Sequence, residues 1–156
     1  SCSLTGLRIW VSAAKVLCFA LYIPLIAVNT LQALALSISV SDGYVVPLLD
    51  ARRMEVYSSV FDSSNVSLRE VKAEIISEMS FSDYFKKQKI YLVGDGVEKC
   101  KGIITHKNVV FIDDKLPSAN EMSMLSFEKY KKNDIEDVAY FEPFYLKEFI
   151  AIKSKK

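Results

Sequence analysis

Residues 44–76 read YVVPLLDARRMEVYSSVFDSSNVSLREVKAEII, and this stretch decides the fold. It contains three runs that are apolar or alternating, at 44–49, 55–61 and 68–76, separated by short polar segments. Runs of this length that are rich in Val, Tyr and Phe and bounded by turn residues are typical of β-strands. The stretch therefore predicts three successive antiparallel strands.

Two details of these strands carry further expectations. Pro47 has no amide hydrogen to donate, so we expect it at a sheet edge or a bulge. In the third run, apolar and charged residues alternate, which indicates a strand that is buried on one face. The apolar residues expected to face the core are Val71, Ala73 and Ile75, and the charged residues expected on the solvent face are Glu70, Lys72 and Glu74.

After residue 76 the pattern changes to short helices alternating with strands. We expect strands at 90–93 and 109–112, and Ser118 with Glu121 has the spacing of a capping box that begins a helix. Three antiparallel strands followed by alternating helices and strands is the order of the ribonuclease-H-like α/β fold. We assign this fold to residues 41–146.

The front of the chain is strongly apolar, and between residues 9 and 40 Lys15 is its only charged residue. Arg8 and Lys15 followed by the apolar residues 16–23 imitate a signal peptide, whereas a membrane span would need about 20 uninterrupted apolar residues. Pro24 and several polar residues interrupt the run at short intervals. We therefore favour a helix–strand–helix unit over a membrane-anchored domain.

This unit divides into a helix at 5–21, a strand at 25–28 and a helix at 31–38, which Asn29 or Thr30 can cap. The first helix is apolar nearly all round. One stripe, at spacings of three and four, consists of Leu7, Val11, Ala14, Cys18 and Leu21. The opposite face consists of Ile9, Ala13, Val16 and Ala20. Such a helix must be covered on more than one side, either inside a larger domain or by a helix of another chain.

Composition excludes several classes of function. Lys and Arg total 20 against 19 acidic residues, so the chain has no basic field to hold nucleic acid. The spacing of its three cysteines, Cys2, Cys18 and Cys100, fits neither a zinc site nor a redox pair. An odd cysteine count without a disulfide framework favours the reducing cytoplasm.

No residue pattern predicts catalysis, a cofactor or a metal. His106 is the only histidine and lies in a polar stretch typical of a surface loop. Asp113 and Asp114 could bind magnesium, but their place after a strand favours a turn. The glycines around Asp95 meet neither phosphate-loop pattern. The tip of the first hairpin has a cluster of charged residues, which could be an acid–base set but are expected there because the tip is exposed to water. They are Asp50, Arg52 and Glu55.

Four separated stretches, in this order, resemble the TsaB (YeaZ) family of bacterial tRNA threonylcarbamoyladenosine biosynthesis proteins. They are LTGLRI at 4–9, IPLIAVNTL at 23–31, LDARRMEVY at 49–57 and EPFYL at 142–146. The resemblance implies one lobe of the two-lobed actin-like ATPase (sugar kinase/heat-shock/actin) fold. It also implies a non-catalytic subunit that binds the catalytic TsaD subunit, with TsaE as an ATPase accessory, and that forms homodimers.

The resemblance implies that both kinds of dimer form through the first helix. The expected partner interface consists of Thr5, Leu7, Arg8, Trp10, Val11, Ala14, Lys15, Cys18 and Leu21. Trp10 and Val16 stand where the family has small residues, and bulky residues there hinder the close approach of a second helix. An ATP-handling enzyme of the same superfamily is the alternative function.

The family's opening strands and first helix have no counterpart in this chain. We therefore expect residues 1–40 to be the remnant of the first lobe that joins the lobes, 41–146 to be the second lobe, and 147–156 to be a basic tail. A chain without most of the first lobe is expected to be inactive or impaired in tRNA modification.

Overall fold

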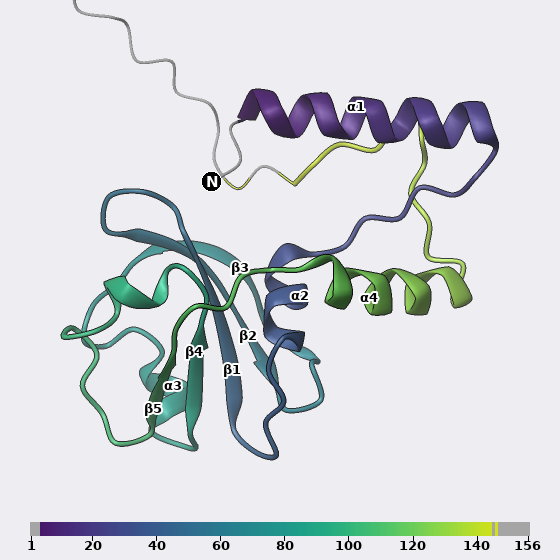
Figure 1. Ribbon diagram of the computed structural model, residues 1–156. Coiled ribbons are helices and arrows are strands. Elements are labelled where there is room, and N and C mark those ends of the chain that lie inside the picture. The colour runs from purple at the N-terminus through teal and green to yellow at the C-terminus, as the bar shows by residue number, and fades with distance from the viewer. Residues whose placement is uncertain (1–3, 145, 147–156) are drawn as a thin grey trace, which may run out of the picture. The chain divides into compact units, whose positions relative to one another are not determined.

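A computed structural model describes residues 4–144 and 146 (Figure 1). The chain divides into two compact units, one of residues 1–25 with 136–156 and one of residues 26–135. Cys2 and the predicted tail at 147–156 lie outside the described residues. The assignment of residues 1–40 and 41–146 to two lobes stays a prediction.

The unit of residues 26–135 is built on a five-stranded sheet with the order β3-β2-β1-β4-β5. The strands are β1 (Tyr44–Asp50), β2 (Glu55–Asp62), β3 (Ser67–Ile75), β4 (Ile90–Val93) and β5 (Val109–Ile112). β1, β2 and β3 are antiparallel neighbours, whereas β4 and β5 continue the sheet parallel to β1. The predicted mixed sheet is confirmed.

Helices precede, connect and follow the strands. They are α2 (Thr30–Leu36), α3 (Ser82–Phe85), the 3₁₀-helix η1 (Val97–Lys99) and α4 (Ala119–Lys131). Asn29 caps α2, because its Oδ1 accepts hydrogen bonds from the amides of Leu31 and Gln32 at 2.9 and 3.3 Å. Ser118 caps α4 by accepting from the amide of Asn120 and also bonds Glu121. Both predicted helix starts are confirmed.

Apolar side chains fill both faces of the sheet, and Figure 1 shows α2 and α3 on either side of it. The cluster under α2 consists of Leu31, Leu34, Ala35, Val45, Phe61 and Val93. The opposite, larger cluster includes Val46, Leu48, Val56, Ile90, Leu92, Phe81, Phe85 and Cys100. Successive residues of β1 point to opposite faces, so Val45 and Val46 serve different clusters.

The expectation that Pro47 marks a sheet edge or a bulge is wrong. Pro47 lies in β1, the central strand, where it pairs with Val93 of β4. The ladder to β2 is formed on either side of it, by Val45 with Phe61 and by Leu48 with Ser58. The central strand tolerates this proline because the ladder pairs before and after Pro47 keep β1 in the sheet without the hydrogen bond that its missing amide hydrogen would make.

The alternation predicted for β3 holds for Val71 and Ala73 but is wrong for Ile75, which is 66% exposed. Ile75 lies opposite Glu55 at the end of the edge strand, beyond the cluster that Val71 joins under α2. The predicted solvent position of Glu74 is also wrong, because this residue is half-buried.

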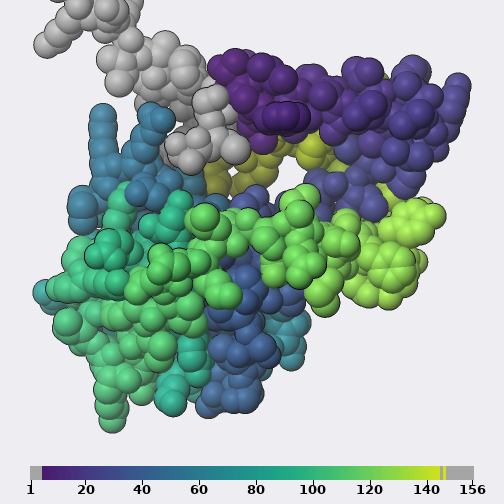
Figure 2. Space-filling view, in the orientation of Figure 1, coloured from purple at the N-terminus to yellow at the C-terminus, as the bar shows by residue number. Residues whose placement is uncertain are grey.

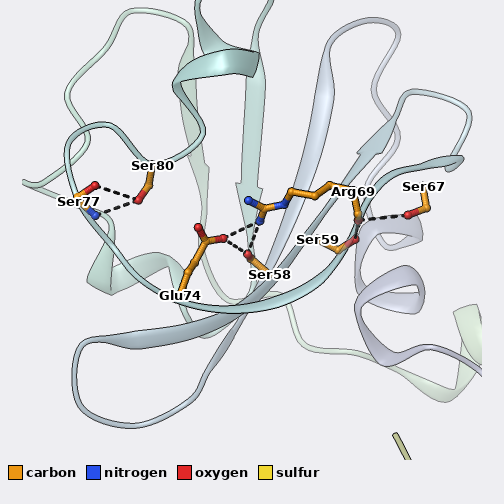
Figure 3. Close-up of polar contacts among 7 residues, drawn as sticks. All are labelled: Ser58, Ser59, Ser67, Arg69, Glu74, Ser77 and Ser80. Carbon is orange, nitrogen blue, oxygen red and sulfur yellow. Dashed lines mark hydrogen bonds and ion pairs between the residues drawn. The ribbon is translucent and has the colours of Figure 1, made fainter. Parts of the chain in front are cut away.

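A polar network explains the burial of Glu74 (Figure 3). Nη2 of Arg69 donates to Glu74 Oε1 at 2.6 Å and also bonds Ser58 Oγ, which in turn donates to Glu74. The guanidinium of Arg69 lies 5.1 Å from the centre of the Phe81 ring. Register shifts between β2 and β3 beside Ser58 let these side chains meet.

The other unit contains α1 (Leu4–Leu21), close to the predicted 5–21. The helix ends in a Schellman motif: Tyr22 adopts φ 55° and the Ile23 amide donates to Cys18 O at 3.1 Å. The strand predicted at 25–28 is wrong, since only Leu25 forms an isolated antiparallel bridge, with Glu136. An apolar run without a neighbouring strand forms no ladder.

Gly94 connects β4 to η1, and we expect Gly94→Ala to destabilise the fold. Its φ is 118°, and an added Cβ would lie 2.2 Å from Leu48 O and 2.7 Å from Leu34 Cδ2. Strain and overpacking together predict a loss of about 2–4 kcal/mol in the free energy of unfolding, measured in urea. The matched control is Gly102→Ala, with φ 78° and open space around the added Cβ, which should cost about 1 kcal/mol. Equal losses for the two variants would contradict the close approach at Gly94.

Cys100 lies in the larger core cluster with no exposed surface, and we expect it to resist alkylation. Burial, assisted by the nearby Glu74 carboxylate, raises the pKa of the Cys100 thiol to about 12, so thiolate is scarce at neutral pH. Iodoacetamide labelling at about pH 8, mapped by mass spectrometry, should modify the half-buried Cys18 well before Cys100. Comparable labelling of both thiols in the folded chain would show that this part of the core is open.

Candidate protein-binding helix

The α1 helix has one half-buried side. It consists of the predicted stripe without Leu21 but with Lys15, namely Leu7, Val11, Ala14, Lys15 and Cys18. Residues 136–144, which we call the strap, run along α1 (yellow-green in Figure 1). Nζ of Lys15 donates to Ala139 O at 3.0 Å and to Phe141 O at 3.1 Å, and so ties the strap to the helix.

The strap is also ordered by its own hydrogen bonds. At its start, the Glu136 amide donates to Leu25 O at 2.8 Å. Asp137 Oδ1 accepts from the amides of Ala139 and Tyr140, and Asp137 O accepts from the Phe141 amide. These bonds fold residues 137–141 into a compact turn whose carbonyl groups can meet Lys15.

Most of the remaining circumference of α1 is apolar and exposed. Phe19, which is 76% exposed, lies two turns after Ser12. The neighbouring stripe, which we call the apolar face, consists of Ile9, Trp10, Ala13, Val16, Leu17, Ala20 and Leu21. Trp10 is 73% exposed and Val16 66%, and the other large members are more than half exposed. Figure 2 shows α1 (purple) as an uninterrupted row of side chains. Exposed apolar surface of this extent marks a place of interaction.

The expected interface residues are thus divided between two sides of α1. Trp10 and Leu21 belong to the apolar face, and Thr5 and Arg8 are exposed beside it. Leu21, expected on one stripe with Leu7 and Cys18, is 62% exposed and lies three turns after Trp10 on the same side. The other expected residues lie on the half-buried side of α1.

Leu17, which is 58% exposed, is the one large member of the apolar face that sequence reasoning missed. Its spacing of seven residues from Trp10 and four from Ala13 was the available signal. In a helix that is apolar all round, several stripes are equally apolar. Spacing alone therefore did not single out the stripe that contains Leu17.

Asp50 of the first hairpin forms a structural ion pair with Lys99 of η1. Asp50 Oδ1 accepts from Lys99 Nζ at 2.7 Å and from the Arg52 amide at 2.6 Å, and Lys99 also donates to Glu55 O at 2.9 Å. The hydrogen bond from Lys99, followed by that from the Arg52 backbone, lowers the pKa of Asp50. Asp50 therefore stays ionised and holds the turn in place.

The remaining titratable candidates also have structural partners. His106 stacks on Phe85 with ring centres 4.7 Å apart, and its Nδ1 accepts from the Asn108 amide at 3.3 Å. Asp113 accepts from Lys101 at 2.9 Å, and Asp114 adopts φ 58° in a turn, as expected.

A shallow pocket opens where β4 and β5 end. Its lining consists of Gly94, Asp95, Glu98, Lys101, Asp113 and Asp114. Lys101 bridges Glu98 and Asp113, and these two hydrogen bonds raise its pKa. Within residues 4–144 and 146, no three His, Cys, Asp or Glu side chains are grouped to hold a metal ion. In the same residues, no helix combines the length and apolar character needed to cross a membrane.

Solved structures with the same arrangement come from Pseudomonas aeruginosa. YeaZ and a protein described as uncharacterized with similarity to peptidase YEAZ match with TM-scores of 0.74 and 0.75. Each match has 20% sequence identity and covers 94% of this chain and 70% of the other. At this identity the likeness concerns the fold alone, and it agrees with the predicted ribonuclease-H-like α/β fold.

Sequence comparison gives the family. The model of the family TsaD: tRNA N6-adenosine threonylcarbamoyltransferase matches residues 3–153, and the chain belongs to this family. A stretch of 69 residues is 42% identical to the tRNA threonylcarbamoyladenosine biosynthesis protein TsaB of Bacillus subtilis (strain 168). It covers 44% of this chain and 30% of that relative. The resemblance to TsaB (YeaZ) is thereby confirmed.

Asp50 predicts a pH dependence of stability. Its pKa in the folded chain lies below the ordinary value of 3.8, so the ion pair stabilises the fold above that pH and is lost as the pH falls through the lowered value. Asp50→Asn should therefore destabilise the chain at about pH 7, where Lys99 would remain charged, and much less in acid, once the pH has fallen through the lowered pKa. Urea unfolding at neutral pH and at several acid pH values measures the difference. A difference that does not shrink at low pH would show that the Asp50 charge is not responsible.

Proposed function

We propose that this chain is a non-catalytic subunit of the machinery that makes threonylcarbamoyladenosine in tRNA, and that it binds the catalytic TsaD-type subunit. Membership of the family and the resemblance to TsaB support a role in this tRNA modification. The single observation that carries the binding role is the apolar face of α1, because Trp10, Val16 and Leu17 are all more than half exposed.

The chemistry of this face suits a helix–helix interface. Burying a large apolar side chain contributes about 1.5–3 kcal/mol, and the apolar face has five of them. Trp is also strongly enriched at binding hot spots. A partner that presents an apolar helix of its own would remove both surfaces from water. A second copy of this chain satisfies the same condition, so homodimer and heterodimer compete for one face.

The two units of the chain have separate parts in this proposal. We propose that residues 26–135 represent the second lobe and that α1 belongs to the region joining it to the first lobe. On this proposal the isolated chain retains the binding helix but is impaired in supporting tRNA modification. A TsaE-type ATPase would then contact the complex rather than this helix alone.

Leu17→Glu tests the binding role. A carboxylate in the middle of the apolar face would be desolvated on association, so we expect affinity for the TsaD-type subunit of the same organism to fall by about a hundredfold. The matched control is Ser12→Glu, an exposed position of α1 outside the apolar face, which should change affinity by less than about threefold. Isothermal titration measures both.

Sedimentation of each variant alone tests the homodimer on the same face. If Leu17→Glu and Ser12→Glu bind the subunit as the unaltered chain does, α1 is not the binding helix. Threonylcarbamoyl transfer by this chain without any partner would contradict the non-catalytic role.

A further inference from the structure

Lys15 is a charged residue among mostly apolar neighbours in α1. It shares the half-buried side of the helix with Leu7, Val11 and Cys18, and it is the only charged residue between positions 9 and 40. A lysine can lay its aliphatic stem along apolar neighbours, but its ammonium group must find polar partners. The strap supplies these partners through the carbonyl oxygens of Ala139 and Phe141.

These two hydrogen bonds differ in kind from the other contacts of the helix. Apolar contacts are non-directional, and α1 offers apolar residues on both the strap side and the apolar face. The strap contains aromatic residues, among them Phe141, that could cover either side. The bonds from Lys15, by contrast, form only when the strap lies on the side from which the ammonium group projects.

We propose that Lys15 is a positioning residue that directs the strap to the Leu7–Cys18 side of α1 and thereby leaves the apolar face free for a partner. The second half of this statement rests on the proposed function. Without Lys15, the strap loses its directional contact, and it detaches or moves toward the apolar face. Binding of the strap there would compete with the partner for Trp10 and Leu17.

Lys15→Met tests this inference in the full chain, because methionine keeps the unbranched stem and the high helix propensity but removes the ammonium group. Chymotrypsin can cut the strap at Tyr140 and Phe141. Loss of two charge-assisted hydrogen bonds predicts cleavage there on the order of tenfold faster. Trp10 is the only tryptophan, so its emission reports the apolar face directly. We expect an emission shift to shorter wavelength in dilute, monomeric protein, as the strap moves over Trp10.

Two further variants separate the role of Lys15 from general damage. Arg8→Met removes an exposed cation from the same helix and should leave strap cleavage unchanged. Lys15→Arg retains donors for both carbonyls and should restore most of the protection. Circular dichroism and the unfolding midpoint confirm that each variant is folded.

The readouts distinguish failure of this inference from failure of the proposed function. Strap cleavage and Trp10 emission need no partner, and if both are unchanged in Lys15→Met, the positioning role is overturned. Affinity for the TsaD-type subunit should fall several-fold in Lys15→Met; unchanged affinity together with a released strap would overturn the protective role for the apolar face. If Leu17→Glu leaves affinity intact, the proposed function fails, while the cleavage result still decides the role of Lys15.

Discussion

The fold of residues 26–135 depends on β1 being buried on both faces and paired on both edges. β2 pairs with it antiparallel and β4 parallel, and its alternate side chains enter the two core clusters. The turn after β4 returns so close to β1 that glycine is required at position 94, where a Cβ would meet the Leu48 carbonyl. The parallel half of the sheet is therefore joined to β1 both by the β1–β4 ladder and by the close approach of the turn that follows β4.

In α1, by contrast with β1, only one side of the apolar surface is partly buried, and the other side is exposed. The strap covers one side, and Lys15 makes that contact directional through two carbonyl groups. The other side remains an exposed surface that includes the only tryptophan of the chain. The polar groups elsewhere have local structural tasks: Asp50 with Lys99 holds the first hairpin, and Arg69 with Glu74 joins β2 and β3. Surface chemistry and family membership thus support a binding function.

Local sequence predicted most elements because their determinants are short-range. The alternation in residues 44–76, the capping residues Asn29 and Ser118, and the periodicity of α1 depend on neighbours only a few positions apart. The errors concern long-range partners. The apolar run at 25–28 reads as a strand, but only Leu25 finds a pairing partner, Glu136, far along the chain. Ile75 fits the alternation of β3, yet it lies at the end of an edge strand beyond the core.

By itself, then, the sequence determined the order of strands and helices, the mixed sheet and a first helix that is apolar around its circumference. The tertiary structure alone decided that Pro47 is in the central strand and which side of α1 is covered. The side was undetermined because several stripes of the helix are equally apolar. Contact with the strap, more than a hundred residues later in the chain, removes that equivalence through the two bonds of Lys15.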